Sequence, residues 1–193
     1  ERYDTDGKHT THASIIDKNG NMVAMTNTLS DYFGSTVTVK GRGFVLNNLS
    51  FNFSTVSYSA CNFPQPNKKV RSTKSPTFIF KPDGTPYATI GTPGAGRIVT
   101  TIPQLISNLI DFNMNIQDAI NQPRVFQDRD GALFVEKGIN PSTLRELENR
   151  GHIIRVRQEL DMYFGGAQGG LILTDGSLEG GADPRRDGKS LAY

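Results

Sequence analysis

Several residue types are scarce in this chain of 193 residues, and each shortage excludes a class of protein. A single cysteine, Cys61, excludes an internal disulfide framework and a cysteine-rich zinc site. With only three histidines there are few ligands for other metals, so we expect neither a metal centre nor a cofactor. No apolar run approaches the roughly 18 residues that a membrane-spanning helix needs. The composition predicts one folded domain without a membrane span.

Acidic residues are missing from one long stretch. Residues 32–82 contain no Asp or Glu, although seven basic residues lie there: Lys40, Arg42, Lys68, Lys69, Arg71, Lys74 and Lys81. A region of one charge sign can concentrate an anionic partner, and a solvated basic surface is the alternative reading. Because the basic residues are not interleaved with aromatic residues in a nucleic-acid-binding motif, we do not expect nucleic acid as a partner.

Regular secondary-structure patterns run through the rest of the chain. Alternating residues and Gly-containing turns predict strands at 10–16, 21–29, 77–80 and 87–90, and an antiparallel sheet in the N-terminal half. Apolar residues at helical spacing predict a long helix over 98–112, in which Pro103 marks a kink or the first turn. Further helices are expected at 115–121 and 142–149, and further strands at 134–135, 153–156 and 171–174. This order predicts an α+β fold with a sheet packed against helices.

The first segment with chemical potential is Thr10-Thr11-His12, at the start of the first expected strand. A threonine hydroxyl is a weak nucleophile and needs a nearby base. The α-amine of Thr10 becomes such a base if the bond between His9 and Thr10 is cut. Taken alone, adjacent threonines on a strand are more often structural.

The second segment, residues 91–97, is rich in glycine and connects an expected strand to the long helix. Its backbone N–H groups, beside a helix N-terminus, can bind a phosphate or stabilise an oxyanion. It lacks the pattern of a nucleotide-binding P-loop, and a plain tight turn is the alternative. The third segment, residues 66–76, is basic and rich in hydroxyl groups, so it suits a carboxylate ligand or a surface turn.

Read in order, six segments resemble the small subunit of the γ-glutamyltranspeptidases. They are Thr10-Thr11-His12, Leu46-Asn47-Asn48, Pro66-Asn67-Lys68, Ser75-Pro76-Thr77, Gly91-Thr92-Pro93-Gly94 and Ala182-Asp183-Pro184-Arg185. The resemblance extends from Thr10 to Tyr193 with matching order and closely matching spacing, and it includes Val135-Glu136-Lys137-Gly138. It implies the four-layer αββα sandwich of the N-terminal-nucleophile hydrolases, to which this chain contributes about half. Residues 1–9 would end the large-subunit segment, and residues 10–193 would form the small-subunit catalytic domain.

The resemblance also implies roles for particular residues. Thr10 corresponds to the nucleophile that self-cleavage at His9–Thr10 frees, and it would attack the γ-amide of a donor such as glutathione. Thr28 corresponds to a second threonine that assists it. Gly94 and Ala95 correspond to the pair whose N–H groups form the oxyanion hole. An alanine can serve there provided that the backbone does not demand a positive φ.

Donor binding is where the chain matches the family only in part. Ser72 and Thr73 correspond to two serines that bind the donor α-carboxylate. Ser30 stands where the family has asparagine, Leu49 where it has glutamine, and Asn52 where an aspartate binds the donor α-amine. Loss of such a charged hydrogen bond costs about 1.5–3 kcal/mol. These changes favour an anionic acyl group without an amine, such as the glutaryl-type amides of cephalosporin acylases. An inactive ligand-binding relative is the alternative of another class.

The resemblance finally implies partners and a location. The chain would pair with the large subunit of the same precursor as a heterodimer. Its small-molecule partners would be an amide donor and an amine or water acceptor. Relatives are often periplasmic or extracellular, and a cytoplasmic location is the alternative.

Overall fold

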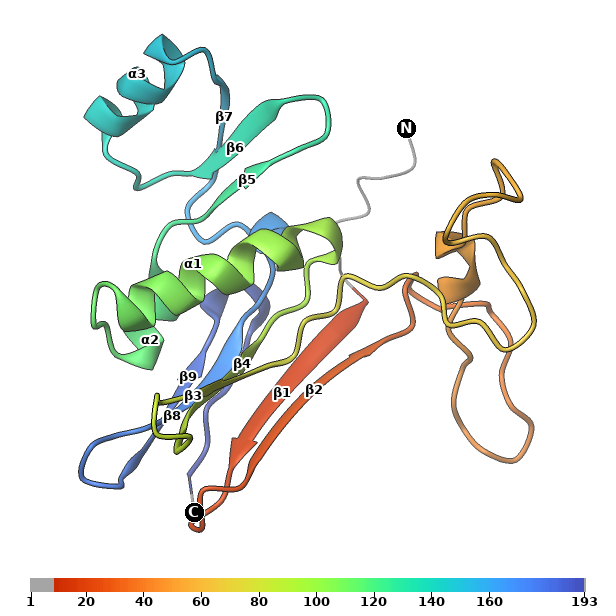
Figure 1. The fold of residues 1–193 in the computed structure, drawn as a ribbon, viewed down its shortest axis with the longest axis horizontal. Helices are drawn as coiled ribbons and strands as arrows, with labels where there is room; N and C mark the ends of the chain where they lie inside the picture. The colour runs from red at the N-terminus through yellow and green to blue at the C-terminus, as the bar shows by residue number, and fades with distance from the viewer. Residues whose placement is uncertain (1–8, 193) are drawn as a thin grey trace.

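A computed structural model describes residues 9–192 of the chain (Figure 1). Apart from His9, the expected large-subunit segment lies outside the described residues. Strands β1 (Thr10–Ile16) and β2 (Met22–Thr28) form an antiparallel hairpin. Asp17 closes its turn by accepting hydrogen bonds from the backbone N–H groups of Asn19 and Asn21, at 2.8 and 2.9 Å. The register places Thr10 directly opposite Thr28 at the open end of the hairpin.

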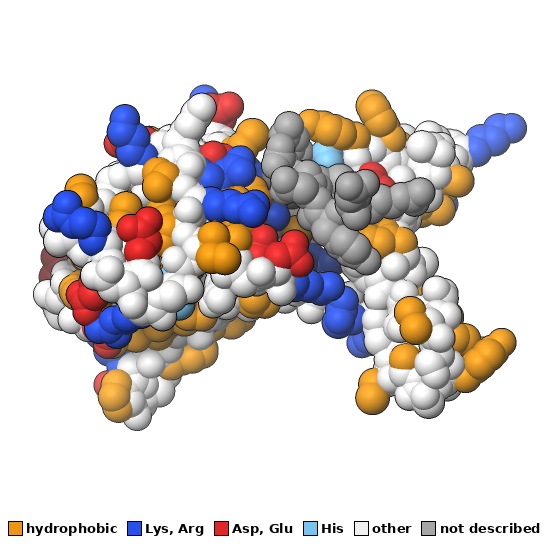
Figure 2. All heavy atoms as spheres, turned by 90° about the horizontal axis from the view of Figure 1, so that it is seen from above, with side chains coloured by type: hydrophobic (Ala, Val, Ile, Leu, Met, Phe, Trp, Pro, Cys, Tyr) orange, Lys and Arg blue, Asp and Glu red, His pale blue; other side chains and the backbone are white. Residues whose placement is uncertain are grey.

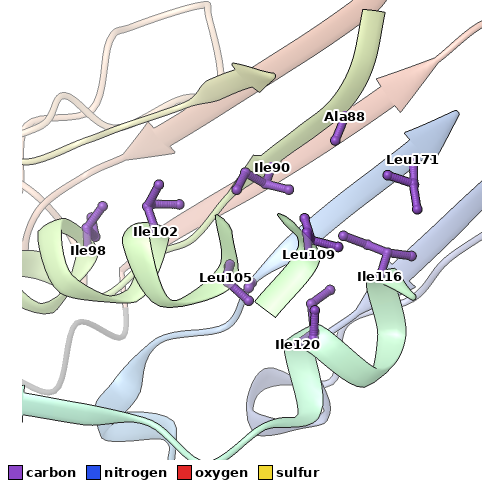
Figure 3. Packing of buried hydrophobic residues seen from close by; sticks show 11 residues of the cluster. Ala88, Ile90, Ile98, Ile102, Leu105, Leu109, Ile116, Ile120 and Leu171 are labelled. Carbon is purple, nitrogen blue, oxygen red and sulfur yellow. The ribbon is translucent and has the colours of Figure 1, made fainter. Parts of the chain in front are cut away.

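A second antiparallel sheet has the strand order β3-β4-β8-β9. Its strands are β3 (Thr77–Phe80), β4 (Pro86–Gly91), β8 (Gln168–Ile172) and β9 (Leu178–Ala182). The hairpin packs against β4 and β8, whereas helices α1 (Ile98–Ile110) and α2 (Ile116–Asn121) contribute to the core around Ile90 and Leu171 (Figures 1 and 3). The chain therefore forms three layers, which are the hairpin, the sheet and the helices.

Two adjacent glycines let the layers approach. A Cβ atom on Gly169 would lie 2.7 Å from Ile116 Cδ1 in the helical layer. A Cβ atom on Gly170 would lie 2.9 Å from Ile16 Cδ1 in the hairpin. Strand β8 therefore includes these glycines and begins at Gln168, earlier than the strand that apolar residues alone predict.

A smaller unit lies between α2 and β8 in the sequence. Strands β5 (Val125–Gln127) and β6 (Ala132–Glu136) pair in antiparallel fashion, and β6 pairs in parallel with β7 (Ile153–Arg157). Helix α3 (Pro141–Asn149) makes the crossover, with Asn140 accepting the capping hydrogen bond from Ser142 N–H at 2.9 Å. The parallel pair requires this helix, because parallel strands cannot be joined by a tight turn.

Residues 29–76, here called the arm, leave the hairpin and return at β3 (Figure 1). Their regular structure consists of a short 3-10 helix, η1 (Leu49–Asn52), and an isolated bridge between Thr38 and Val45. Figure 2 shows basic and hydrophobic side chains dispersed over this part of the molecule, at the right of the view. Among the described residues, no helix combines the length and the apolar character needed to cross a membrane.

Three local expectations are corrected. The N-terminal strands form two packed sheets instead of one, because the long arm separates β2 from β3. Pro103 is the sixth residue of α1 and not part of its first turn, because the 3-10 turn η2 (Ala95–Arg97) precedes the helix. Strand β5 was not expected, since three residues are too few to show a period.

Candidate active site

A surface pocket of about 300 Å³ lies where β1 begins and β2 ends. It is lined by His9, Thr10, Thr11, Asn27, Thr28 and Leu29. The hydroxyl of Thr10 donates a hydrogen bond to Thr28 Oγ1 at 2.9 Å, and both side chains are half-buried. The structure thus brings together two residues that are 18 positions apart and that the sequence analysis had paired.

The carbonyl oxygen of His9, which precedes Thr10, accepts two hydrogen bonds. Thr28 Oγ1 donates to it at 3.3 Å, and Leu29 N–H donates at 3.3 Å. A continuous chain of hydrogen bonds therefore runs from the Thr10 hydroxyl through Thr28 to the His9 carbonyl. Donors placed on a carbonyl oxygen favour the negative charge that develops there during nucleophilic attack.

Ser30 lies directly beyond the pocket and shapes the end of β2. Its N–H donates to Thr28 Oγ1 at 2.9 Å, and its φ of 75° lies in the left-handed region. This conformation turns the chain away from the strand into the arm. The backbone of Ser30 holds Thr28, and the binding role of its side chain stays a prediction.

His12 connects the pocket strand to the second sheet. Its Nδ1 lies 2.7 Å from Thr26 Oγ1, and its Nε2 lies 3.0 Å from Ser14 Oγ, which donates to the Gln168 carbonyl at 3.2 Å. Only 6% of the residue is exposed, and burial lowers the pKa of His12 to about 4. At neutral pH the ring is therefore uncharged. The motif Thr10-Thr11-His12 predicts no role for His12.

The glycine-rich loop follows β4 and begins against this histidine. A Cβ atom on Gly91 would lie 2.1 Å from His12 Cε1, so the loop starts beside the strand that carries Thr10. Gly94 has a φ of 143°, and Ala95 has a φ of 51°. The proviso on Ala95 is therefore not met: the backbone does demand a positive φ, at a cost of roughly 1 kcal/mol for a residue with a Cβ atom.

Thr73 is hydrogen-bonded to this same loop, whereas Asn52 is hydrogen-bonded within the arm. Thr73 Oγ1 donates to the Ala95 carbonyl at 2.9 Å, and Ser72 Oγ accepts from Lys74 N–H at 3.1 Å. Asn52 sits at the end of η1, where its carbonyl accepts from Asn62 Nδ2 at 2.6 Å. No hydrogen bond among residues 9–192 joins Asn52, Ser72 or Thr73 to the lining of the pocket.

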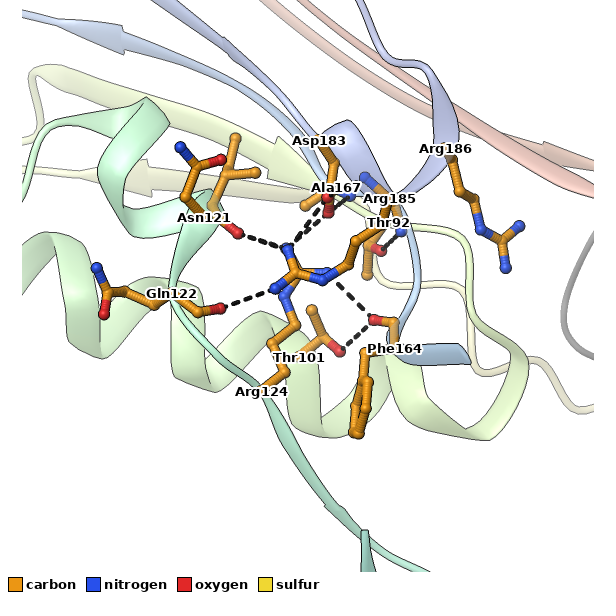
Figure 4. Close-up of polar contacts among 12 residues, drawn as sticks. Thr92, Thr101, Asn121, Gln122, Arg124, Phe164, Ala167, Asp183, Arg185 and Arg186 are labelled. Carbon is orange, nitrogen blue, oxygen red and sulfur yellow. Dashed lines mark hydrogen bonds and ion pairs between the residues drawn. The ribbon is translucent and has the colours of Figure 1, made fainter. Parts of the chain in front are cut away.

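A buried ionic cluster, formed by Arg124, Glu136, Asp183 and Arg185, lies behind the loop. Figure 4 shows Arg124, Asp183 and Arg185 of this cluster. Arg124 Nη2 lies 2.7 Å from Asp183 Oδ2, and Arg185 Nη2 lies 2.6 Å from Glu136 Oε2. Burial lowers the pKa of Arg124, and the neighbouring Asp183 opposes that shift. Each of the four side chains is at most 2% exposed, so this cluster is part of the interior and not a substrate site.

The cluster acts on the loop through residues 164–167. Arg124 Nη1 donates to the Phe164 carbonyl at 3.2 Å, and Ala167 N–H donates to Asp183 Oδ2 at 2.7 Å. Between them, Gly166 N–H donates to Thr92 Oγ1 at 3.1 Å. The sequence motifs do not predict this arrangement, although the segments 135–138 and 182–185 contain Glu136, Asp183 and Arg185. Glu136, which directly follows the apolar residues 132–135, was the signal that could have found it.

Comparison with known proteins gives the same family. The gamma-glutamyltranspeptidase family profile matches residues 1–193. The glutathione hydrolase proenzyme of Escherichia coli is 36% identical over 190 residues, which cover 93% of this chain and 32% of that protein. The acylase ACY 1 proenzyme of Pseudomonas sp. (strain SE83) is 35% identical over 183 residues, which cover 95% of this chain and 32% of that protein.

Solved structures agree with these sequence matches. A gamma-glutamyltranspeptidase from Pseudomonas nitroreducens, complexed with L-DON, aligns with a TM-score of 0.81 at 31% identity, covering 95% of this chain and 99% of that chain. Cephalosporin acylase from Bacillus halodurans aligns with a TM-score of 0.86 at 32% identity, covering 94% of this chain and 34% of that chain.

These likenesses confirm the predicted α+β fold class and the N-terminal-nucleophile hydrolase type of sandwich. The chain contributes the hairpin, sheet and helical layers described above. It spans about a third of the length of the curated relatives that it matches. With the family profile matched over the whole chain, it belongs to the gamma-glutamyltranspeptidase family.

Proposed function

We propose that this chain is the small-subunit part of an acyltransferase or hydrolase that cleaves γ-glutamyl amides of the glutathione type, with Thr10 as the nucleophile. The observation that carries the proposal is the chain of hydrogen bonds from the Thr10 hydroxyl through Thr28 to the His9 carbonyl. Similarity to glutathione hydrolase proenzymes supports the same reaction class. The rest of the relatives' length would correspond to a large subunit that comes from the same precursor.

Maturation would begin at the His9–Thr10 peptide bond. Thr10 Oγ1 attacks the His9 carbonyl carbon and gives its proton to Thr28 Oγ1, which passes its own proton to the developing oxyanion on His9. Leu29 N–H donates a hydrogen bond to the same oxygen. The C–N bond breaks, the Thr10 nitrogen takes a proton, and an ester links His9 to Thr10. Water hydrolyses that ester and leaves a carboxylate on His9 and a free α-amine on Thr10.

Turnover would repeat the same chemistry on a donor. The freed α-amine accepts the proton of the Thr10 hydroxyl as the oxygen attacks the γ-amide carbonyl. The oxyanion would face the N–H groups of Gly94 and Ala95, because Ala95 keeps its N–H donor in the left-handed conformation and only bears its steric cost. The departing amine leaves with a proton. The γ-glutamyl ester on Thr10 is then resolved by water or by an acceptor amine. Ser72 and Thr73 would hold the donor α-carboxylate.

A glutaryl-type acylase is the second candidate function. It is favoured by the neutral Asn52, where an aspartate would bind the donor amine, and by Ser30 and Leu49. Similarity to the acylase ACY 1 proenzyme and to cephalosporin acylase from Bacillus halodurans supports it as well. Both candidate functions use the same nucleophile and differ in the acyl group.

Thr10→Ala in the full-length precursor tests the nucleophile. We expect mass analysis over time to show the unaltered protein splitting between His9 and Thr10. The variant should stay uncut and release no anilide from γ-glutamyl or glutaryl anilides. Thr143→Ala, an exposed threonine on α3, is the matched control and should mature and turn over normally. An unaltered protein that never splits, or a Thr10→Ala variant that retains turnover, would contradict the proposal.

A further inference from the structure

The neutral amide at position 52 raises the question of which residue could bind an ammonium group near the pocket. Between Asp17 and Asp83 the sequence has one acidic residue, Asp31. Every other charged side chain in that interval is basic. A donor with an α-amine would therefore meet either Asp31 or no carboxylate from this part of the chain.

Asp31 lies beside the pocket, because the residues on both sides of it contact the pocket lining. On one side, Ser30 N–H donates to Thr28 Oγ1 at 2.9 Å. On the other side, the ring of Tyr32 lies 3.8 Å from the ring of His9, measured between centroids. Thr28 and His9 both line the pocket, so in the uncut chain the Asp31 backbone is held at its edge from two directions. The hydrogen bond from Ser30 to Thr28 does not involve His9 and keeps Asp31 at this edge after cleavage.

The Asp31 carboxylate is oriented by Asn48. Asn48 Nδ2 donates to Asp31 Oδ2 at 2.5 Å, and Asp31 N–H donates to Asn48 Oδ1 at 3.3 Å. Asn48 N–H in turn donates to the Leu29 carbonyl at 3.2 Å. No residue among 9–192 donates a hydrogen bond to Asp31 Oδ1, and Asp31 is exposed. One carboxylate oxygen is thus anchored and the other is open to a ligand.

Asn48 also joins Asp31 to the segment that carries position 52. The 3-10 helix η1 begins at Leu49, directly after Asn48, and ends at Asn52. The pair Asp31–Asn48 therefore places a negative charge next to the segment where the family resemblance expects one. A charge moved to a neighbouring segment can serve the same ligand, since an ion pair depends on distance and desolvation and not on sequence position.

We propose that Asp31 is a specificity residue that binds the α-ammonium of a γ-glutamyl donor in place of an aspartate at position 52. The inference rests on the proposed function, since it assumes an acyl donor in the pocket at Thr10. It selects γ-glutamyl over glutaryl donors, because the two differ only in the α-amine.

Asp31→Asn in the mature full-length protein tests this assignment. With γ-glutamyl and glutaryl anilides as paired substrates, we expect kcat/KM for the γ-glutamyl donor to fall about 10- to 100-fold. The value for the glutaryl donor should stay unchanged or rise. Equal losses on both donors would show that Asp31 only fixes the arm, and no change on either would show that it does not meet the amine; both results overturn the inference.

Two further variants complete the experiment. Asp130→Asn removes an exposed carboxylate from the turn between β5 and β6 and should change neither donor. Asn52→Asp, added to Asp31→Asn, should restore the preference for the amine-bearing donor, whereas a purely structural defect would persist. If the unaltered mature protein hydrolyses neither anilide, the proposed function fails together with this inference. Hydrolysis of both with no effect of Asp31→Asn overturns the inference alone.

Discussion

The pocket at Thr10 and the ionic cluster behind the glycine-rich loop solve opposite physical problems. At the pocket, uncharged hydroxyl and carbonyl groups are half-buried and joined by hydrogen bonds of 2.9–3.3 Å. In the cluster, four charged side chains are almost fully buried and satisfied by one another and by backbone groups. Four of the five buried charged side chains among residues 9–192 thus belong to the cluster, and the fifth is Arg97 of the loop. Thr10 and Thr28, which are proposed for chemistry, are neutral and half-buried.

This contrast teaches how to read perturbed groups in such a chain. Strong desolvation is often taken as a mark of an active site, but structural ion-pair networks produce it too. The altered pKa of Arg124 reflects burial beside Asp183, far from solvent. A hydroxyl nucleophile that gains its base only after cleavage shows no such mark beforehand.

The largest effect on stability is expected at Asp183, because it pairs with two buried arginines of the ionic cluster. Asp183→Asn removes the charge that faces Arg124 and Arg185 and turns one acceptor into a donor. Removing one partner of a buried pair costs about 3–5 kcal/mol, so the free energy of unfolding should fall by that amount in denaturant titrations.

Glu146→Gln is the matched control, because it neutralises one member of an exposed pair with Arg150 on α3. Exposed pairs contribute at most about 1 kcal/mol, and this variant should unfold nearly as the unaltered protein does. Equal losses for the two variants would show that the buried cluster stabilises the fold no more than an exposed ion pair does.

A smaller effect is expected at His12, which lies between the two regions. Its pKa is about 4 in the folded protein and 6.5 as the ordinary value, so the unfolded chain binds more protons between these limits. Above pH 6.5 the titration of His12 leaves the free energy of unfolding unchanged. As the pH falls from 6.5 towards 4, it lowers the free energy of unfolding. The full loss is about 3 kcal/mol.

His12→Gln removes the titratable ring and so tests whether His12 causes this pH dependence. The free energy of unfolding, measured at several pH values, should decline less steeply between pH 6.5 and 4 for the variant than for the unaltered protein. Parallel curves would mean that His12 is protonated in the fold and that burial does not hold it neutral.

The smallest effect is expected at Ala95, on the loop that links the two regions. Glycine adopts a φ of 51° without the steric cost that alanine bears. Ala95→Gly should therefore raise stability by up to about 1 kcal/mol, seen as a higher melting temperature. Ala13→Gly, within β1, should lower it. A lower melting temperature for Ala95→Gly would contradict the backbone strain assigned to Ala95.

Much of the fold could be predicted because local patterns decide it. The hairpin bounds, the helix over Ile98–Ile110 and the Asn140 cap follow from alternation, helical spacing and capping chemistry. The separation into two packed sheets could not be predicted in this way, since it depends on contacts between β1 and β8, which lie far apart in the sequence.

The candidate site, too, could be predicted from the sequence only in part. Thr10 and Thr28 were paired through the family resemblance, and the strand register then brings their hydroxyls into contact. The left-handed conformation of Ala95, the orientation of Asp31 by Asn48 and the burial of Arg124 depend on the folded backbone. A motif can indicate which residues matter, but not which conformation or partner each one adopts.

The tight contact between His12 and Gly91 also restricts how this protein can evolve. Any side chain at position 91 would overlap the imidazole ring, with a Cβ atom 2.1 Å from Cε1. A mutational route that enlarges position 91 must first pass through a smaller residue at position 12. Variants that enlarge position 91 while keeping histidine at position 12 should therefore be less stable than the unaltered protein.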